Sequence, residues 1–434
     1  MENKIIIPKK LQGFWELMPK EQIYFSQMLE KLEKVFSSNC FLPLDTPILE
    51  YSETLLAKSG GETDKEVYRF SKGSTDMCMR YDLTVPLARF VSMHKDELNF
   101  PFKRYQIGKV YRGERPQKGR FREFYQCDAD IIGNESLSIV ADAECVRLFE
   151  KCFKALELDV EIEVSNRKLL SGYIQSINKE DKIIDILIVL DKIEKIPHDD
   201  IISMLKEIGL SENECENITK LVKTEGEFKK IEEKLKNFCK NPLFEEGLNE
   251  LKELDNYLSL MGSKAVKYNL SIIRGHNYYT GTVFEGFLKG KKNLGAVGGG
   301  GRFENLCSYF SKQKMPGVGM SVGITRLFNL LMSENYFDLE KANEIDCAII
   351  TFDETFDYGI KISSILREKG IKAENFYENK TFKSKMKEAN KRNINFVVIV
   401  GEDEIKEQKF TLKNMQTSEQ EKLTLDEIAK KIKG

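Results

Sequence analysis

The sequence predicts an α+β fold built on an antiparallel sheet, with a helical insertion and a separate α/β domain in its C-terminal part. Between residues 103 and 133, two segments with alternating polar and apolar side chains flank a short basic loop, as the strands of a hairpin do. Residues 178–262 are rich in Lys and Glu and have almost no strand pattern. Residues 345–434 alternate strand and helix patterns, which predicts a small α/β domain with a largely parallel sheet.

Segments along the rest of the chain support this outline. Apolar residues at helical spacing predict an amphipathic helix over residues 20–37. The segment FLPLDTPILE, residues 41–50, contains two prolines and is predicted to be extended. The segment DMCMRYDLTVPLARF, residues 76–90, is typical of a strand that leads into a helix. Strand patterns resume at residues 271–287, and residues 316–332 predict a strand-to-helix turn.

Composition limits the classes of function. A chain of 434 residues with 41% hydrophobic content has room for two or three domains with ordinary cores. The net charge of −2 gives no general attraction to nucleic acid, so any polyanion site must come from a local patch. Nine scattered cysteines without a C-x-x-C pair predict reduced thiols and no structural zinc. We expect a soluble protein with neither a secretory signal nor a membrane span.

The predicted hairpin carries complementary polar groups on one surface. Because side chains alternate along a strand, Arg104, Gln106 and Arg112 share one face of its first strand. The matching face of the return strand carries Arg122, Phe124, Gln126, Asp128 and Asp130. From Lys103 to Arg122, eight basic residues accompany a single acid, Glu114. A solvated hairpin explains the charge alone, but an aromatic ring and carboxylates on the same face favour a site for a nucleotide beside a small polar or cationic ligand.

Other motifs are ambiguous by themselves. Residues 319–323 match the G-x-S-x-G nucleophile elbow, but no histidine follows His276 to complete an esterase triad. The glycines at 298–301 lack the Lys-Ser/Thr ending of a phosphate loop, and they predict close approach of the backbone to a ligand or to a neighbouring strand. Arg302 suits a structural ion pair and a functional role equally. The tyrosines at 278–279 suit a core as well as a site.

Taken in order, five segments resemble histidyl-tRNA synthetases, a family of class II aminoacyl-tRNA synthetases, over nearly the whole chain. LDTPILE, YRGERPQKGRFREFYQCDADIIG and GVGMSVGITRL resemble the three class II motifs, while RYDLTVPLARF and RGHNYYTGTVFE resemble the histidine-specific signatures. The resemblance implies a catalytic domain over residues 1–335 with the insertion at about 178–262, a linker at 336–344 and an anticodon-binding domain at 345–434. It also implies that histidine and ATP form histidyl-adenylate, and that the histidyl group then moves to the 3′ end of its tRNA.

The resemblance further implies roles for individual residues. Three catalytic arginines contact the phosphates of ATP: Arg112, Arg274 and Arg326. Glu114 and Phe124 hold the adenine. The histidine pocket consists of Asp82, Thr84, Gln126, Asp130, Tyr278 and Tyr279. Gln117 and Arg122 approach the acceptor end of the tRNA. ATP with Mg²⁺ is the expected cofactor set, no metal ion is expected to be held by the protein, and the expected protein is a cytoplasmic homodimer.

The chain departs from the usual pattern of the family at three places. His276-Asn277 stands where a pair such as leucine-aspartate is usual, Phe303 replaces a tyrosine and Thr325 replaces a glutamate. These changes bear on histidine selectivity and rate. Two alternatives are a regulatory subunit of the phosphoribosyltransferase that begins histidine synthesis and a pseudo-synthetase that senses tRNA or histidine. The regulatory subunit typically lacks the C-terminal domain, and the pseudo-synthetase would have lost the residues for ATP chemistry. This chain keeps both the C-terminal domain and the three arginines.

Overall fold

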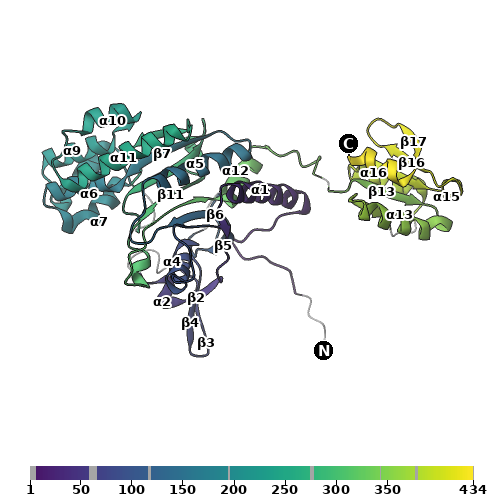
Figure 1. Ribbon diagram of the computed structural model, residues 1–434, viewed down its shortest axis with the longest axis horizontal. Coiled ribbons are helices and arrows are strands. Elements are labelled where there is room, and N and C mark those ends of the chain that lie inside the picture. Colours follow the sequence, from purple (N-terminus) through teal and green to yellow (C-terminus); the bar gives the residue numbers. More distant parts are fainter. Residues whose placement is uncertain are drawn as a thin grey trace. The chain divides into compact units, whose positions relative to one another are not determined.

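The chain forms two compact units. A computed structural model describes residues 6–57, 66–115, 119–193, 196–273, 278–342, 344–376 and 380–433 (Figure 1). The larger unit consists mostly of residues 28–334 and the smaller mostly of residues 335–434. Within the described ranges, no helix combines the length and the apolar character needed to cross a bilayer.

A nine-stranded sheet forms the centre of the larger unit. In spatial order its strands are β1 (Leu42–Pro43), β5 (Phe102–Tyr111), β6 (Glu123–Ile132), β12 (Gly317–Val322), β11 (Gly298–Phe303), β10 (Thr282–Leu288), β7 (Val160–Asn166), β9 (Val266–Asn269) and β8 (Glu225–Gly226). Among these strands, β1 runs parallel to β5 and β7 to β9, and the other neighbours are antiparallel. The predicted antiparallel sheet is confirmed. A smaller sheet contains β2 (Leu49–Tyr51), β4 (Thr75–Met79) and β3 (Arg69–Lys72).

The predicted hairpin is the pair β5 and β6. Their register places Arg104 opposite Asp130, Gln106 opposite Asp128 and Val110 opposite Phe124. The face predicted from side-chain alternation is therefore continuous across both strands. On its other side β6 pairs with β12, which is nearly 200 residues further along the chain, so the sheet brings together the segments that resemble the second and third class II motifs.

Helix α5 (Val140–Ala155) covers one face of the large sheet. The ring of Phe149 lies 5.8 Å from that of Phe284 on β10. Side chains at two neighbouring positions would prevent this packing, because a Cβ at Gly286 or Gly298 would lie 2.2 Å or 2.7 Å from the Phe149 ring. A Cβ at Gly300 would lie 2.1 Å from the carbonyl oxygen of Gly319 on the next strand. Close approach of strands and helix thus explains the glycine run, in agreement with one of its two predicted explanations.

The remaining helices of this part of the chain fall into two groups. Those outside the stretch from β7 to β9 are α1 (Pro19–Ser38), of which residues 28–38 belong to the larger unit, α2 (Ser52–Leu55), α4 (Thr84–Met93) and α12 (Ile324–Ser333). Those between β7 and β9 are α6 (Arg167–Ser176), α7 (Ile183–Leu190), α8 (His198–Ile208), α9 (Glu212–Val222), α10 (Phe228–Leu235) and α11 (Pro242–Leu260). The second group gathers at one end of the sheet in Figure 1. Residues 20–37 are helical as predicted.

The smaller unit is an α/β domain with a five-stranded sheet. Its strand order is β14 (Ala373–Asn375), β13 (Cys347–Thr351), β15 (Phe396–Val400), β16 (Phe410–Asn414) and β17 (Gln420–Leu423). Its helices are α13 (Phe356–Glu368), α14 (Phe382–Lys391), α15 (Glu402–Glu407) and α16 (Leu425–Lys433). Thr424 and Glu427 form the predicted capping box of α16.

The sheet of this domain is mixed, which corrects the expectation of a largely parallel one. β13 runs parallel to both β14 and β15, but β16 is antiparallel to β15 and to β17. Residues 401–409 are too few for a parallel crossover, which needs a dozen or more residues. Residues 415–419 form only a tight hairpin loop.

Candidate active site

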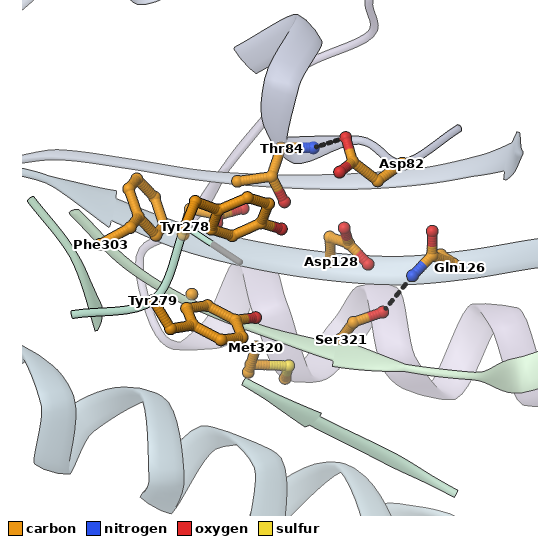
Figure 2. A pocket seen from close by; sticks show the side chains of 11 residues that line it. Asp82, Thr84, Gln126, Asp128, Tyr278, Tyr279, Phe303, Met320 and Ser321 are labelled. Atoms are coloured by element: carbon orange, nitrogen blue, oxygen red, sulfur yellow. Dashed lines mark hydrogen bonds between the residues drawn. The ribbon is translucent and has the colours of Figure 1, made fainter. Parts of the chain in front are cut away.

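A polar pocket lies on the sheet face opposite α5. Side chains of Asp128 and Asp130 point to this face, whereas the alternating residues Cys127 and Ala129 point toward α5. The residues that line the pocket are Asp82, Thr84, Gln126, Asp128, Asp130, Tyr278, Tyr279, Phe303, Gly319, Met320 and Ser321 (Figure 2). All six residues predicted to bind histidine belong to this set.

Asp82 and Thr84 reach the pocket from the turn that starts α4. One carboxylate oxygen of Asp82, Oδ1, accepts hydrogen bonds from the backbone N–H groups of Thr84 at 3.1 Å and Val85 at 2.9 Å. This arrangement caps the helix and fixes the carboxylate, because the first N–H groups of a helix have no partner within the helix. The second carboxylate oxygen is then held in place to receive a cationic ligand group.

The innermost part of the hairpin is a buried ion pair. Arg104 is fully buried, and its Nη2 lies 2.7 Å from Oδ2 of Asp130 and 3.1 Å from the carbonyl oxygen of Leu83. A Cβ at Gly319 would lie 2.0 Å from Oδ1 of Asp130, so only glycine leaves room for this carboxylate. The pair corrects the sequence prediction that Arg104 belongs to a polyanion site, because Asp130 already compensates its charge.

Lys103 and Lys109 of the same strand are compensated as well. Lys103 pairs with Glu144, and Lys109 lies 2.9 Å from Glu123. Because these carboxylates neutralise two further charges, the predicted basic surface narrows to the loop end of the hairpin.

Five of the eleven lining residues were absent from the predicted histidine site, and two of these, Asp128 and Ser321, lie next to the predicted Gln126. Gln126 donates a hydrogen bond from Nε2 to Oγ of Ser321 at 3.0 Å (Figure 2). Asp128 is buried beside them, and its Oδ1 has no hydrogen-bond partner among the described residues. Burial raises the pKa of Asp128 to about 7 and that of Asp130 to about 6, although Arg104 acts to lower both. Strand alternation had already placed Asp128 on this face and was sufficient to identify it.

Aromatic rings close another side of the pocket. Tyr278 and Tyr279 meet edge to face with ring centroids 5.0 Å apart. The ring of Phe303 lies 5.9 Å from Tyr278 and is only 1% exposed. Burial raises the pKa of both tyrosines well above the usual value, so both hydroxyls are neutral and able to donate hydrogen bonds. Phe303 therefore supports Tyr278 by packing.

At the loop end of the hairpin, Arg112 lies between two aromatic rings. The carbon of its guanidinium is 4.3 Å from the centroid of Tyr81 and 5.1 Å from that of Phe124. Its Nε donates to the carbonyl oxygen of Tyr81 at 3.3 Å. The described residues supply no hydrogen-bond partner to its two terminal nitrogens. A guanidinium held in this way presents a fixed fork to an anion.

A second arginine lies at the start of α12. Nη2 of Arg326 donates to the carbonyl oxygen of Leu294 at 2.8 Å, while its buried Nε has no partner among the described residues. Burial, and next the positive charge of Arg120, lower the pKa of Arg326. Repulsion between these like charges favours the binding of an anion near Arg326.

Glu114 and Arg122 connect the two sides of the basic loop. Nε of Arg122 donates to the carbonyl oxygen of Glu114 at 3.1 Å, and the carboxylate of Glu114 lies 3.4 Å from Arg120. These contacts join the two described sides of the loop close to Phe124, where a nucleotide base was predicted. Two other predicted site residues, Arg274 and Gln117, lie outside the described residues, as do His276 and Asn277.

The structure resolves the ambiguous motifs. Arg302 binds the buried carboxylate of Asp142 through Nε and Nη2, with the shortest distance 2.6 Å, and therefore has a structural role. Ser321 lies within strand β12 and accepts a hydrogen bond from Gln126, so it is a pocket residue and not a nucleophile at a sharp turn. Thr325 accepts a hydrogen bond from the backbone N–H of Tyr125 at 2.9 Å.

Comparison with known proteins agrees with this geometry. The histidyl-tRNA synthetase family profile matches residues 13–327, and the anticodon binding domain profile matches residues 346–434. The chain is 44% identical to a histidine–tRNA ligase from Clostridium tetani over 100% of both chains, and 39% identical to one from Helicobacter pylori over 96% of both. A crystal structure of histidyl-tRNA synthetase from a Nostoc species superposes with a TM-score of 0.89 at 33% identity, covering 99% of each chain. This chain therefore belongs to the histidyl-tRNA synthetase family.

Proposed function

We propose that the protein activates histidine with ATP and transfers the histidyl group to the 3′ end of its tRNA. Membership of the family supports the reaction. The observation that carries the proposal for the site is the pocket itself, in which three carboxylates, an amide and two tyrosines converge beside the hairpin arginines. This combination suits an amino acid whose side chain has two nitrogens.

Histidine recognition is assigned to the inner pocket. The second carboxylate oxygen of Asp82 is proposed to pair with the α-ammonium group, while Asp130 and a tyrosine hydroxyl hold the two ring nitrogens. The buried pair of Arg104 with Asp130 supports this assignment, because it fixes the orientation of the carboxylate before the ligand arrives. A ligand without those hydrogen bonds leaves buried groups unpaired, and discrimination of about 10⁴ follows from that cost.

Adenylate formation is assigned to the loop end of the hairpin. A carboxylate oxygen of histidine attacks the α-phosphorus of ATP, and the new P–O bond forms while the bond to pyrophosphate breaks. Arg112 stabilises the negative charge on the phosphoryl oxygens. Arg326 holds the γ-phosphate end, Phe124 stacks on adenine and Glu114 faces its amino edge. The proposal for Arg274 as a third cation depends on the family resemblance alone.

Transfer completes the cycle. The terminal ribose hydroxyl of tRNA attacks the carbonyl carbon of the adenylate, an ester forms, and AMP leaves as the hydroxyl loses its proton. Gln117 and Arg122 are proposed to approach the acceptor end. The match of residues 346–434 to an anticodon binding domain supports recognition of the far end of the tRNA.

Further features of the enzyme are proposals of the same kind. Mg²⁺ is proposed to enter bound to the ATP phosphates, its usual mode of binding at such sites. Leu42, Leu49 and Tyr51 are more than 40% exposed beside the first class II motif and support a homodimer. The nine free cysteines support a cytoplasmic location. We place the catalytic domain at residues 1–335 and the anticodon-binding domain at 345–434.

Exchange of pyrophosphate into ATP, measured with each of the twenty amino acids, tests the proposal. We expect exchange with histidine only. Absence of exchange with every amino acid would favour a regulatory or sensing paralogue, and exchange with a different amino acid would reject the assigned pocket. Histidylation of tRNA then checks the second step.

A further inference from the structure

Arg167, the first residue of α6, joins the helical group to the segment that carries the pocket tyrosines. Its backbone N–H donates to the carbonyl oxygen of Gly281 at 2.9 Å. Its Nη1 donates to the carbonyl oxygen of Tyr279 at 3.1 Å, and its Nη2 to that of Ile273 at 3.0 Å. One residue thus holds the backbone on both sides of residues 274–277, which lie outside the described residues.

Arg167 has no carboxylate partner among the described residues, unlike Arg104 and Arg302. Its Nε is buried without a hydrogen-bond partner in the same part of the chain. Burying a guanidinium costs free energy, and two neutral carbonyls compensate a charge less well than a carboxylate does. Such an arrangement contributes little to stability, and its consequence is geometric, because the planar fork fixes two carbonyl oxygens relative to each other.

The base that carries Arg167 is rigid. The neighbouring Lys168 lies 2.8 Å from Glu246 and 2.6 Å from Glu250 of α11. The two helices approach so closely that a Cβ at Gly172 would lie 2.4 Å from the backbone nitrogen of Phe244. Displacement of Arg167 would require α6 and α11 to move together, so the guanidinium transmits the position of this helix pair to the pocket.

A cavity beside Arg167 allows two contributions of its guanidinium to be separated: the hydrogen bonds to the two carbonyl oxygens, and the fixed distance between those oxygens. A cavity of about 240 Å³ lies beside the residue, bordered also by Tyr279, Ile273 and Leu187. Water is small enough to enter a cavity of that size and to bind the two carbonyl oxygens if the guanidinium is removed. Water restores the hydrogen bonds but does not fix the distance between the two carbonyls. Loss of Arg167 therefore affects the geometry of the tyrosine segment more than it affects folding.

We propose that Arg167 is a positioning residue for histidine binding, which holds Tyr278 and Tyr279 against the pocket by fixing the carbonyl oxygens of Ile273 and Tyr279. The inference depends on the function proposed above, because histidine is the ligand of that pocket. The inference predicts a selective effect on histidine binding. Tyr279 lines the histidine pocket, whereas Arg112 and Arg326 form no hydrogen bond with Arg167 among the described residues. The KM for histidine should change and the KM for ATP should not.

The test compares Arg167→Met and Arg167→Lys with a matched control, Lys168→Met, in histidine-dependent pyrophosphate exchange and in thermal unfolding. For Arg167→Met we expect the KM for histidine to rise about tenfold, the effect of losing roughly one charge-assisted hydrogen bond. Arg167→Lys should give a smaller rise, because an ammonium does not bridge both carbonyls. The KM for ATP should change less than about twofold in both. Lys168→Met should lower the unfolding temperature, leave the KM for ATP unchanged and raise the KM for histidine much less than Arg167→Met does, because the guanidinium and its two carbonyl partners remain.

Equal increases in the KM values for histidine and ATP would overturn the proposal, and so would an unchanged KM for histidine in Arg167→Met. An increase of the KM for histidine in Lys168→Met as large as in Arg167→Met would also overturn it, because loosening of α6 would then be sufficient. If Arg167→Met does not fold, the comparison of Arg167→Lys with Lys168→Met decides. Absence of exchange by the unsubstituted protein would reject the proposed function as well, whereas normal exchange with an unaffected variant rejects only the role of Arg167.

Discussion

The two ends of the β5–β6 hairpin carry arginines on the same strand face but use their charges differently. At the inner end Arg104 is fully buried and lies 2.7 Å from the carboxylate of Asp130. At the loop end Arg112 lies against the rings of Tyr81 and Phe124, and its terminal nitrogens have no hydrogen-bond partner in the part of the chain that the structure describes. The fold uses the first charge internally and leaves the second for a ligand.

This difference assigns histidine selection to the inner end of the hairpin and catalysis to its loop end. A buried, paired carboxylate keeps a fixed geometry, which selectivity requires. A cation that is held by aromatic rings but is not neutralised retains its attraction for a developing negative charge, which rate acceleration requires. We therefore expect loss of the ion pair at the inner end to reduce stability and selectivity, and loss of Arg112 at the loop end to reduce the rate alone.

The largest expected effect is on stability, from Asp130→Asn. The substitution keeps the size of the side chain but leaves Arg104 buried without its carboxylate, which costs up to about 3 to 5 kcal/mol in the free energy of unfolding. The burial that raises the pKa of Asp130 offsets part of this loss, because an uncharged side chain is easier to bury. Urea denaturation of the free protein measures it. Glu144→Gln is the matched control, because it removes the partner of Lys103 on the outer face of the same strand and should cost less than about 1 kcal/mol. Equal losses in the two variants would contradict a special role for the inner pair.

The next effect is on rate, from Arg112→Ala. Removal of one fixed donor to the developing phosphoryl charge should slow adenylate formation by about 10²- to 10³-fold. Single-turnover formation of the adenylate measures the step directly. The free energy of unfolding should change by less than about 1 kcal/mol, since Arg112 is half-buried and bonds through Nε alone to a backbone carbonyl in the described part of the chain.

Lys109→Ala serves as the control for Arg112→Ala. It removes a positive charge from the same strand, but this lysine is paired with Glu123 and lies on the other face. Its rate should stay close to that of the unsubstituted enzyme. A similar slowing in both variants would mean that the general positive potential of the hairpin matters, and not the position of Arg112.

Sequence patterns predicted the face of the hairpin but not the state of its charges. Alternation along a strand is a local property, and it correctly placed Arg104, Gln126 and Asp128 on one surface. Charge compensation depends on partners that are distant in sequence: Glu144 is 41 residues from Lys103, and Asp142 is 160 residues from Arg302. For that reason the basic stretch was predicted as a polyanion site although carboxylates already neutralise Lys103, Arg104 and Lys109.

Dependence on distant segments also explains why the strand directions of the smaller unit and the role of Gly319 were not predicted. The strand patterns of residues 345–434 gave the α/β class, but strand direction depends on connection lengths that the pattern left undefined. Gly319 is one residue in a glycine-rich motif, and only the register of β12 against β6 shows that it makes room for Asp130. Local periodicity therefore gives elements and faces, whereas the site requires pairings between distant segments.

The third prediction concerns pH and sharpens the description of the inner end. Burial raises the pKa of Asp128 to about 7, so its ionised fraction rises roughly tenfold between pH 6 and pH 8. The ionised form attracts the α-ammonium group of histidine, so the KM for histidine should fall as pH rises over this range. Asp128→Asn lacks this pH-dependent attraction. The measurement is the ratio of the KM for histidine of Asp128→Asn to that of the unsubstituted protein at each pH, because titration of free histidine affects both proteins equally.

The free protein should show the opposite sign in its stability. Because the pKa of Asp128 is higher in the folded state than its ordinary value, the folded state binds this proton more tightly than the unfolded state does. The contribution of Asp128 to stability is therefore present at pH 4 and is lost as pH rises toward about 7. Asp128→Asn should consequently gain stability relative to the unsubstituted protein between pH 5 and pH 8. A constant difference would mean that Asp128 titrates at an ordinary pKa.

The smallest expected effect comes from Ser321→Ala, at the border between the two ends. Ser321 accepts the hydrogen bond of Gln126 at 3.0 Å, and its loss frees the amide to rotate away from the pocket. One neutral hydrogen bond contributes about 0.5 to 1.5 kcal/mol, so the KM for histidine should rise between about twofold and tenfold. Thr325→Val is the matched control, because it removes a hydroxyl that also binds β6, but at the backbone of Tyr125. It should lower the free energy of unfolding by about 1 kcal/mol and leave the KM unchanged. If Thr325→Val raises the KM as much as Ser321→Ala does, the position of β6 as a whole, and not the orientation of Gln126, governs histidine binding at this border.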